Sequence, residues 1–170
     1  MNIERILARD NALLLQQGLR LLEGMAQELY VKPEPAIVGS SIGGHLRHIL
    51  DHYASLFVKG DEVDYDLRAR EESIECSLEK GIERLRQIVG RLEGLVVDGP
   101  LDRKIKVDTG HQAWTASSLA RELQFVASHT VHHYALIGVI LRLNGVTVPE
   151  DFGVAPSTLR YREEVESCAR

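Results

Sequence analysis

The sequence predicts an all-α protein, an antiparallel four-helix bundle with a small hairpin in the crossover between its third and fourth helices. Most of the chain spaces its apolar residues every three or four positions, which is typical of amphipathic helices. Glycine, proline and serine residues divide these periodic segments into four. A chain of 170 residues can bury one sizeable core, so we expect one domain over 1–170, with a C-terminal extension from about residue 146.

Two helices are predicted in the N-terminal third of the chain. The apolar positions of residues 3–30 form one continuous stripe, which predicts a long first helix. Pro33 and Pro35 cannot continue a helix, because proline lacks the backbone N–H that a helix interior needs. The pair Ser40–Ser41 then offers N-cap oxygens for a second helix that runs to about Lys59.

The middle of the chain predicts a third helix followed by two short strands. Helical spacing extends over about 66–97 and ends at Gly99–Pro100. Lys104–Val107 instead alternates polar and apolar residues, Asp108–Gly110 has the composition of a turn, and Gln112–Trp114 can return as a second strand. We therefore expect a small β-hairpin between the third and fourth helices.

A fourth helix and a tail complete the expected architecture. Ser117 or Ser118 can cap a helix whose apolar spacing continues to Asn144–Gly145, where an asparagine and a glycine favour a C-terminal stop. The tail beyond contains two prolines and one short helical pattern from Ser157. In a bundle of this kind, cofactor sites are built from side chains that face inward from neighbouring helices.

Composition restricts the classes of partner. The 20 basic and 25 acidic residues give a formal net charge of −5, and no basic block offers a surface for phosphates, so we expect no nucleic acid partner. The longest apolar run, Ala135–Leu141, is too short to span a bilayer, and the N-terminus lacks the apolar region of a signal peptide. We expect a soluble cytoplasmic protein whose Cys76 and Cys168 are ordinary reduced cysteines.

Six of the seven histidines fall into two short stretches, and both stretches lie in predicted helices. The first stretch contains His45, His48 and His52, and the second contains His129, His132 and His133. Residues three or four apart share one face of a helix, so each stretch presents imidazoles along a stripe. Burying several imidazoles costs free energy unless their nitrogens find partners, and one metal ion supplies several partners at once. Three histidine ligands leave a coordination position of a divalent metal open.

The fourth helix holds the strongest pair of candidate ligands. One turn of helix aligns the rings of His129 and His133. His132 points about 100° away from His133, so we expect it to face another surface or the mouth of the site. The alternative interpretation is a surface stripe of histidines that binds no metal.

His48 is the central candidate on the second helix. His45 and His52 lie one turn to either side of it, so each could be a ligand, a residue that orients a ligand, or a substrate contact. The chain lacks Glu-x-x-His, His-x-x-x-Glu and His-Glu-x-x-His motifs, which favours a mononuclear site over di-iron or protease-type sites. Gly43–Gly44 in the first turn indicates either close helix packing or a backbone that a substrate approaches.

The segments Ser41–Ile49 and Ser128–His133 together resemble the signature of the DinB-like superfamily of metal-binding four-helix bundles. By element order, the resemblance extends over roughly residues 5–145. The ligands that it implies are His48, His129 and His133. It also implies a divalent transition metal, zinc or nickel above all, and a homodimer. Characterised members include S-transferases that depend on a low-molecular-weight thiol, bacillithiol or mycothiol, and the mycothiol-dependent maleylpyruvate isomerase.

These observations favour a divalent-metal-dependent enzyme, a thiol-dependent S-transferase or a hydrolase that acts on a small-molecule substrate. A metal ion turns a thiol or a water into a nucleophile near neutral pH. The candidate proton acceptors or substrate contacts are His45, His52 and His132. Arg47, Arg68 and Arg70 could anchor an anionic cosubstrate, although a solvated helix face explains them equally well. The rival is a non-catalytic metal- or ligand-binding bundle, whose ion has four protein ligands and no open position.

Overall fold

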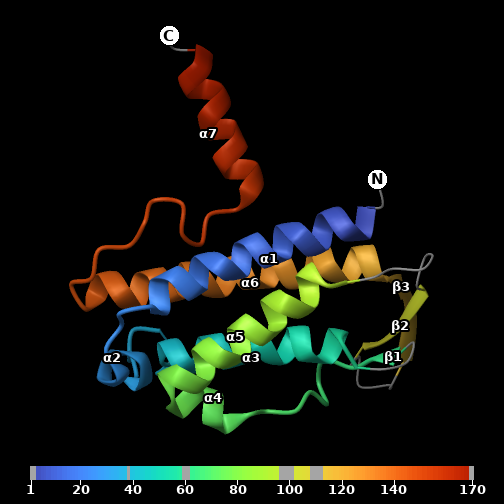
Figure 1. Ribbon diagram of the computed structural model, residues 1–170, viewed down its shortest axis with the longest axis horizontal. Helices are drawn as coiled ribbons and strands as arrows, with labels where there is room; N and C mark the ends of the chain where they lie inside the picture. Colours follow the sequence, from blue (N-terminus) through green and yellow to red (C-terminus); the bar gives the residue numbers. More distant parts are fainter. Residues whose placement is uncertain (1–2, 38, 59–61, 96–101, 108–112, 169–170) are drawn as a thin grey trace.

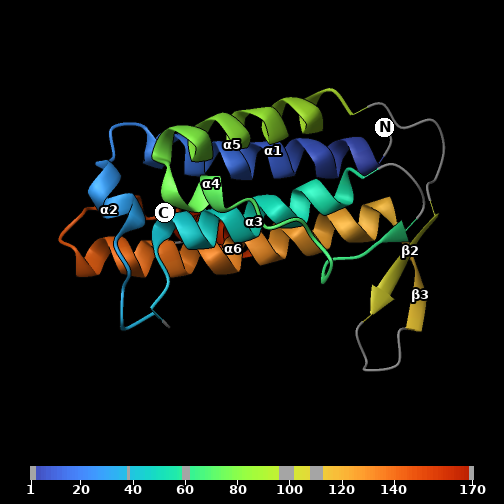
Figure 2. The same cartoon turned by 90° about the horizontal axis from the view of Figure 1, so that it is seen from below.

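The structure is a computed structural model that describes residues 3–37, 39–58, 62–95, 102–107 and 113–168. It is mostly helical, as predicted (Figure 1). Its body consists of the helices α1 (Ile3–Leu22), α3 (Ile42–Leu56), α5 (Leu78–Glu93) and α6 (Leu119–Leu143). α1 packs against α5 and α6, and α3 packs against the same two helices. α1 and α6 begin at the end of the body that carries the strands, whereas α3 and α5 end there, so the two pairs run in opposite directions (Figures 1 and 2).

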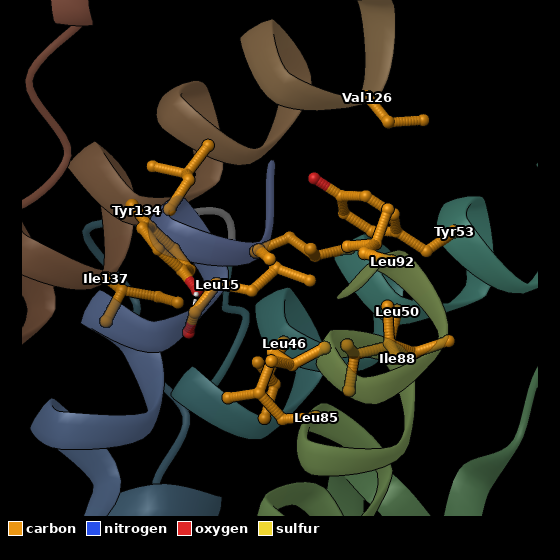
Figure 3. Packing of buried hydrophobic residues seen from close by; sticks show 14 of the residues in the cluster. Leu15, Leu46, Leu50, Tyr53, Leu85, Ile88, Leu92, Val126, Tyr134 and Ile137 are labelled. Carbon is orange, nitrogen blue, oxygen red and sulfur yellow. Dashed lines mark hydrogen bonds between the residues drawn. The ribbon is translucent and has the colours of Figure 1, made fainter. Parts of the chain in front are cut away.

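Apolar side chains from all four body helices fill the space between them (Figure 3). The buried set includes Leu15 of α1, Leu46 and Leu50 of α3, Leu85 and Ile88 of α5, and Tyr134 and Ile137 of α6. Full burial of one such aliphatic side chain contributes about 1.5–3 kcal/mol. A buried polar link joins three helices, because the Tyr53 hydroxyl donates to Asn11 Oδ1 and the Asn11 amide donates to the backbone carbonyl of Leu123.

The first helix is shorter than predicted. The expected single helix over 3–30 ends at Leu22, and α2 (Gln27–Val31) is a separate element. Gly24 has a φ of 89°, in the left-handed region that glycine adopts without steric cost, and this residue ends the helix. The apolar stripe is continuous in the sequence because Leu29 of α2 packs against the same core.

The predicted third helix over 66–97 is split. α4 spans Glu72–Cys76, Ser77 follows it, and α5 begins directly afterwards. The Ser77 hydroxyl accepts a hydrogen bond from the backbone N–H of Lys80, so it is the N-cap of α5. The predicted stop at Gly99–Pro100 lies outside the described residues.

Residues 64–71 form a non-helical connection, which we call the strap. Asp64 Oδ1 accepts hydrogen bonds from the backbone N–H groups of Asp66 (2.9 Å) and Leu67 (3.0 Å). Such an Asx turn competes with helix formation, so the helix predicted from Asp66 begins only at Glu72. The strap runs back along α3 from the strands to α4 (Figure 2).

Three short strands form a sheet at one end of the body. β2 (Asp102–Val107) and β3 (Ala113–Ser118) pair antiparallel along their whole length, which confirms the predicted hairpin. The predicted turn, Asp108–Gly110, lies outside the described residues. β1 (Glu62–Val63) adds to the sheet parallel to β2, and its two residues are too few to show alternation in the sequence.

The predicted helix caps are confirmed. Ser41 accepts a hydrogen bond from the backbone N–H of Gly44 at the start of α3, and Ser118, one of two predicted alternatives, caps α6. Gly145, with a φ of 75°, follows the end of α6. The tail forms α7 (Pro156–Cys168), close to the predicted start, and α7 extends away from the body (Figure 1). Across the described ranges, no helix combines the length and the apolar character needed to cross a membrane.

Tyr30 of α2 is fully buried between α3 and α5. Its hydroxyl donates to the backbone carbonyl of Ile74 (2.8 Å). A Cβ at Gly81 would collide with the Tyr30 hydroxyl, and a Cβ at Gly43 would lie 2.7 Å from the Tyr30 ring. At Gly43 the structure therefore supports close packing, the first of the two interpretations of this glycine pair.

Candidate metal centre

Helices α3 and α6 bring five imidazoles into one cluster. The cluster consists of His45, His48 and His52 from α3 and His129 and His133 from α6. The members on each helix are three, four or seven residues apart and therefore share a face. Because α3 packs against α6, these two faces meet, as the sequence predicted.

Three of these rings are close enough to share one ion. One ring nitrogen from each of His48, His52 and His129 lies within 4.8 Å of the other two. The ring centroids are 4.5 Å apart for His48 and His52, 4.2 Å for His52 and His129, and 4.9 Å for His48 and His129. Zinc–nitrogen bonds are about 2.0–2.1 Å long, so nitrogens on one ion lie roughly 3–4 Å apart. Small side-chain adjustments would bring this group to that spacing.

His133, the third predicted ligand, lies beside this group. Its ring centroid is 4.6 Å from that of His48 and 4.5 Å from that of His129, as near as the ring of His52. Its Nδ1 lies 3.0 Å from the Nδ1 of His45, so these two rings share a hydrogen bond. The set of His48, His129 and His133 therefore stays a prediction, with His52 as the alternative third ligand.

The lone pairs of the ring nitrogens suit a metal ion. The Nδ1 of His52 lies 2.7 Å from the backbone carbonyl oxygen of His48, which only accepts, so His52 carries its proton on Nδ1 and a free lone pair on Nε2. The Nε2 of His129 is buried and has no hydrogen-bond partner among the described residues. Leaving such a nitrogen unpaired costs about 1–3 kcal/mol, a cost that a cation would remove. Neutral imidazole nitrogens are ligands that zinc and nickel accept.

Burial keeps the imidazoles neutral. Burial, followed by the nearby His52 and His129, lowers the pKa of His48 to about 3. Burial is also the main cause that lowers the pKa of His129 to about 4 and that of His133 to about 3. The pKa of His45 and that of His52 are lowered as well, again mainly by burial. A histidine must be neutral to bind a metal, so no proton has to leave these rings at neutral pH.

The three predicted proton acceptors or substrate contacts lie in different environments. His45 is buried, and its Nε2 has no hydrogen-bond partner among the residues that the structure describes. His132 is exposed, with its ring 5.1 Å from that of His133, so it lies at the edge of the cluster. His52 is buried within the cluster.

The strap covers the cluster with Tyr65 and Arg68. The Tyr65 ring stacks on the His52 ring, with 5.3 Å between centroids and 20° between planes. Arg68 Nη2 donates to His48 Nδ1 (3.1 Å), and Arg68 Nη1 donates to the backbone carbonyl of Tyr65 (2.8 Å). Tyr65 is a site residue that sequence reasoning missed. The available signal was Asp64, whose Asx turn delays the start of the helix predicted from Asp66.

A buried carboxylate on α6 anchors the strap. Glu122 is 2% exposed, and it accepts hydrogen bonds from the hydroxyls of Tyr65 (2.8 Å) and Ser117. One turn further along α6, Phe125 packs against the rings of Tyr65 (5.1 Å) and His129 (5.8 Å). The strap, the start of α6 and the histidine cluster therefore form one connected unit.

The three candidate anion anchors differ in what they contact. Arg47 is held by two carboxylates, with 2.9 Å from its Nε to Glu75 Oε2 and 3.5 Å from its Nη1 to Asp51 Oδ2. Arg70 is exposed. Arg68 is the one whose guanidinium donates to a ring of the cluster.

The fold and the site define a mostly helical protein with a cluster of neutral histidines between two packed helices. In a comparison with known proteins, the chain is 33% identical over 104 residues to FK506-binding protein 5 of Rhizopus delemar, a match that covers 58% of this chain and 27% of that protein. The chain thus spans little more than a quarter of the length of the relative it matches. No family model and no solved structure matches the chain.

Proposed function

We propose that this protein is a divalent-metal-dependent enzyme of the DinB-like kind, a thiol-dependent S-transferase or hydrolase that acts on a small molecule. The observation that carries the proposal is the buried Nε2 of His129, which has no partner among the described residues and lies in one group with nitrogens of His48 and His52. The opposite directions of α1 and α6 relative to α3 and α5 support an antiparallel four-helix bundle. The match to FK506-binding protein 5 adds no function, because it covers 27% of that protein.

We assign the ligand roles to His48, His129 and His133, the set that the resemblance implies. His133 can donate its Nδ1 proton to Nδ1 of His45 and so keep the lone pair of Nε2 for the ion, which makes His45 the residue that orients this ligand. His52 then lies next to the ion, with its lone pair on Nε2. Zinc or nickel bound there would lower the pKa of a thiol or water at its open position to near 7.

The surrounding residues would orient the reactants and exclude water. The hydrogen bond from His52 Nδ1 to a backbone carbonyl fixes its ring, so its Nε2 can accept the proton of an incoming thiol or water. Tyr65 and Phe125 cover the cluster with aromatic rings. A drier site strengthens the electrostatic interactions within it.

The metal content of single alanine variants tests the ligand assignment. After loading with zinc or nickel, we expect His48→Ala, His129→Ala and His133→Ala to retain much less metal than the wild type. The matched control is His132→Ala, which removes an exposed imidazole at the edge of the cluster and should retain the metal. His52→Ala should keep the metal and lose activity. If His52→Ala loses the metal and His133→Ala retains it, the third ligand is His52. If every variant retains the full metal content, the proposed metal centre is wrong.

Metal removal separates the enzyme from the non-catalytic bundle. We expect chelation to abolish turnover on a panel of low-molecular-weight thiols and electrophiles, and metal addition to restore it. Circular dichroism should show that most of the helix content remains, because the apolar core packs without the ion. A structural ion would behave in the opposite way, since its binding free energy is folding free energy. Unfolding without any metal-restored turnover would favour the non-catalytic rival.

A further inference from the structure

The guanidinium of Arg68 has one incompletely paired edge at the histidine cluster. Its Nη1 donates to the backbone carbonyl of Tyr65, and its Nη2 donates to Nδ1 of His48. Its Nε is buried and finds no acceptor in the part of the chain that the structure describes. Nε and Nη2 carry the two parallel N–H groups that a guanidinium offers to a planar acceptor. Nε is therefore unpaired, and Nη2 has an imidazole as its acceptor.

Arg68 cannot donate a hydrogen bond to His48 while a metal ion is bound to that imidazole. A neutral imidazole has one lone pair and one N–H. Because Arg68 only donates, the lone pair of His48 is on Nδ1 and its proton is on Nε2. A metal ion must take this lone pair, or take a lone pair on Nε2 after the proton has moved to Nδ1. In both cases Arg68 Nη2 loses its acceptor.

We propose that the Nε–Nη2 edge of Arg68 binds a carboxylate of the small-molecule substrate, an inference that rests on the metal site of the proposed function. Once a metal ion occupies His48, this edge presents two adjacent N–H donors that lack acceptors. Buried donors of this kind cost free energy until a ligand pairs with them. A carboxylate supplies two coplanar oxygens at the matching spacing. Arg68 is then a specificity-determining residue, and metal loading makes it available.

The local charges favour a carboxylate over a phosphate. Arg47, the neighbouring guanidinium, is already held by Glu75 and Asp51. Arg68 also lines a cavity of about 450 Å³ together with Asp51, Glu62 and Asp64, whose carboxylates disfavour an anion there. In the metal-loaded protein the ion adds its positive charge to that of the guanidinium, and these carboxylates repel a singly charged carboxylate less than a phosphate dianion.

Cobalt-loaded protein provides the direct test, because the visible bands of Co²⁺ respond to ligands near the ion. We expect propionate to bind the wild type and Arg70→Met with the same midpoint, and to bind Arg68→Met at least about tenfold more weakly. Arg70→Met is the matched control, since Arg70 is an exposed arginine of the same strap. Arg68→Lys keeps the charge but lacks the planar fork, so it should resemble Arg68→Met.

Zinc affinity without propionate is a second readout, measured by competition with a chelating dye. Arg68→Met should bind Zn²⁺ about tenfold more tightly than the wild type, because the competitor for His48 is gone. Three results would each overturn this inference and leave the metal site intact. They are unchanged propionate affinity in both Arg68 variants, unchanged zinc affinity in Arg68→Met, and Arg68-dependent binding of phosphate that is tighter than the binding of propionate. A wild-type protein that binds neither metal would overturn the proposed function as well.

Discussion

The partly buried imidazoles make the stability of the metal-free protein depend on pH. Burial lowers the pKa of His48 and of His133 to about 3 in the folded protein, whereas an unfolded chain has histidine pKa values near 6.5. Between these values the unfolded chain binds more protons than the folded protein, so the free energy of unfolding falls as the pH falls. The stabilisation is fully present above about pH 6.5 and is lost progressively towards about pH 3.

We therefore expect the chelator-treated protein to unfold at a lower urea concentration at pH 5.5 than at pH 7.5. The double variant His48→Gln/His133→Gln should show a shallower dependence on pH, because it lacks two of the groups that take up protons on unfolding. His132→Gln, which replaces an exposed histidine, should keep the wild-type dependence. A wild-type urea midpoint that is the same at both pH values would contradict this account.

Two glycines of α5 provide a matched test of the packing around Tyr30. A Cβ at Gly81 would collide with the Tyr30 hydroxyl and lie 3.1 Å from Leu46, whereas a Cβ at Gly90 would meet nothing within 4 Å. Gly81→Ala should lower the free energy of unfolding by about 1–3 kcal/mol through overpacking. Gly90→Ala should raise it by about 0.5–1 kcal/mol through helix propensity. Urea titration measures both, and equal effects would mean that the Tyr30 contact does not constrain α5.

Residue spacing predicted the members of the histidine cluster but not their hydrogen bonds. Spacing defines which imidazoles share a helix face, and it placed His48 and His129 in one site. The proton positions on these rings depend on partners elsewhere in the fold, such as Arg68 on His48. Arg68 was a candidate anchor, but its contact with the cluster depends on the course of the strap, which the spacing did not reveal.

At the level of the elements, periodicity located the helices but not every break between them. The caps Ser41 and Ser118 were predicted because each serine precedes a periodic segment. Gly24 and Ser77 interrupt segments whose apolar stripe continues across the break. The stripe continues because residues on both sides pack against one core, and burial depends on position in space rather than on helical continuity.

A single substitution in the strap tests whether Glu122 anchors it. Tyr65→Phe removes one of the two hydroxyls that donate to the buried Glu122. We expect a loss of about 1–3 kcal/mol in the free energy of unfolding, because a buried carboxylate oxygen loses its partner. Amide hydrogen exchange should accelerate in residues 64–71. Tyr161→Phe, at an exposed tyrosine of α7, is the control, and unchanged exchange in the strap would show that Glu122 does not anchor it.

For the whole molecule, the resemblance to DinB-like proteins predicts a homodimer. The described surface includes exposed apolar side chains on α6 and α7, among them Val139, Leu143, Tyr161 and Val165. Light scattering at micromolar concentration measures the mass directly. We expect about twice the 19.0 kDa of one chain. A monodisperse species of 19.0 kDa would rule the dimer out.

Tyr30 also sets the position of α3 along its own axis. Gly43 of α3 and Gly81 of α5 leave the space into which this tyrosine fits, and its hydroxyl is tied to the backbone of Ile74. A slide of α3 by one turn would move each of its imidazoles by about 5.4 Å relative to α6. That shift exceeds the 4.8 Å within which the nitrogens of His48, His52 and His129 lie. α2 contributes no histidine. Through Tyr30, however, it fixes the axial position of α3 and therefore which imidazoles of α3 face those of α6.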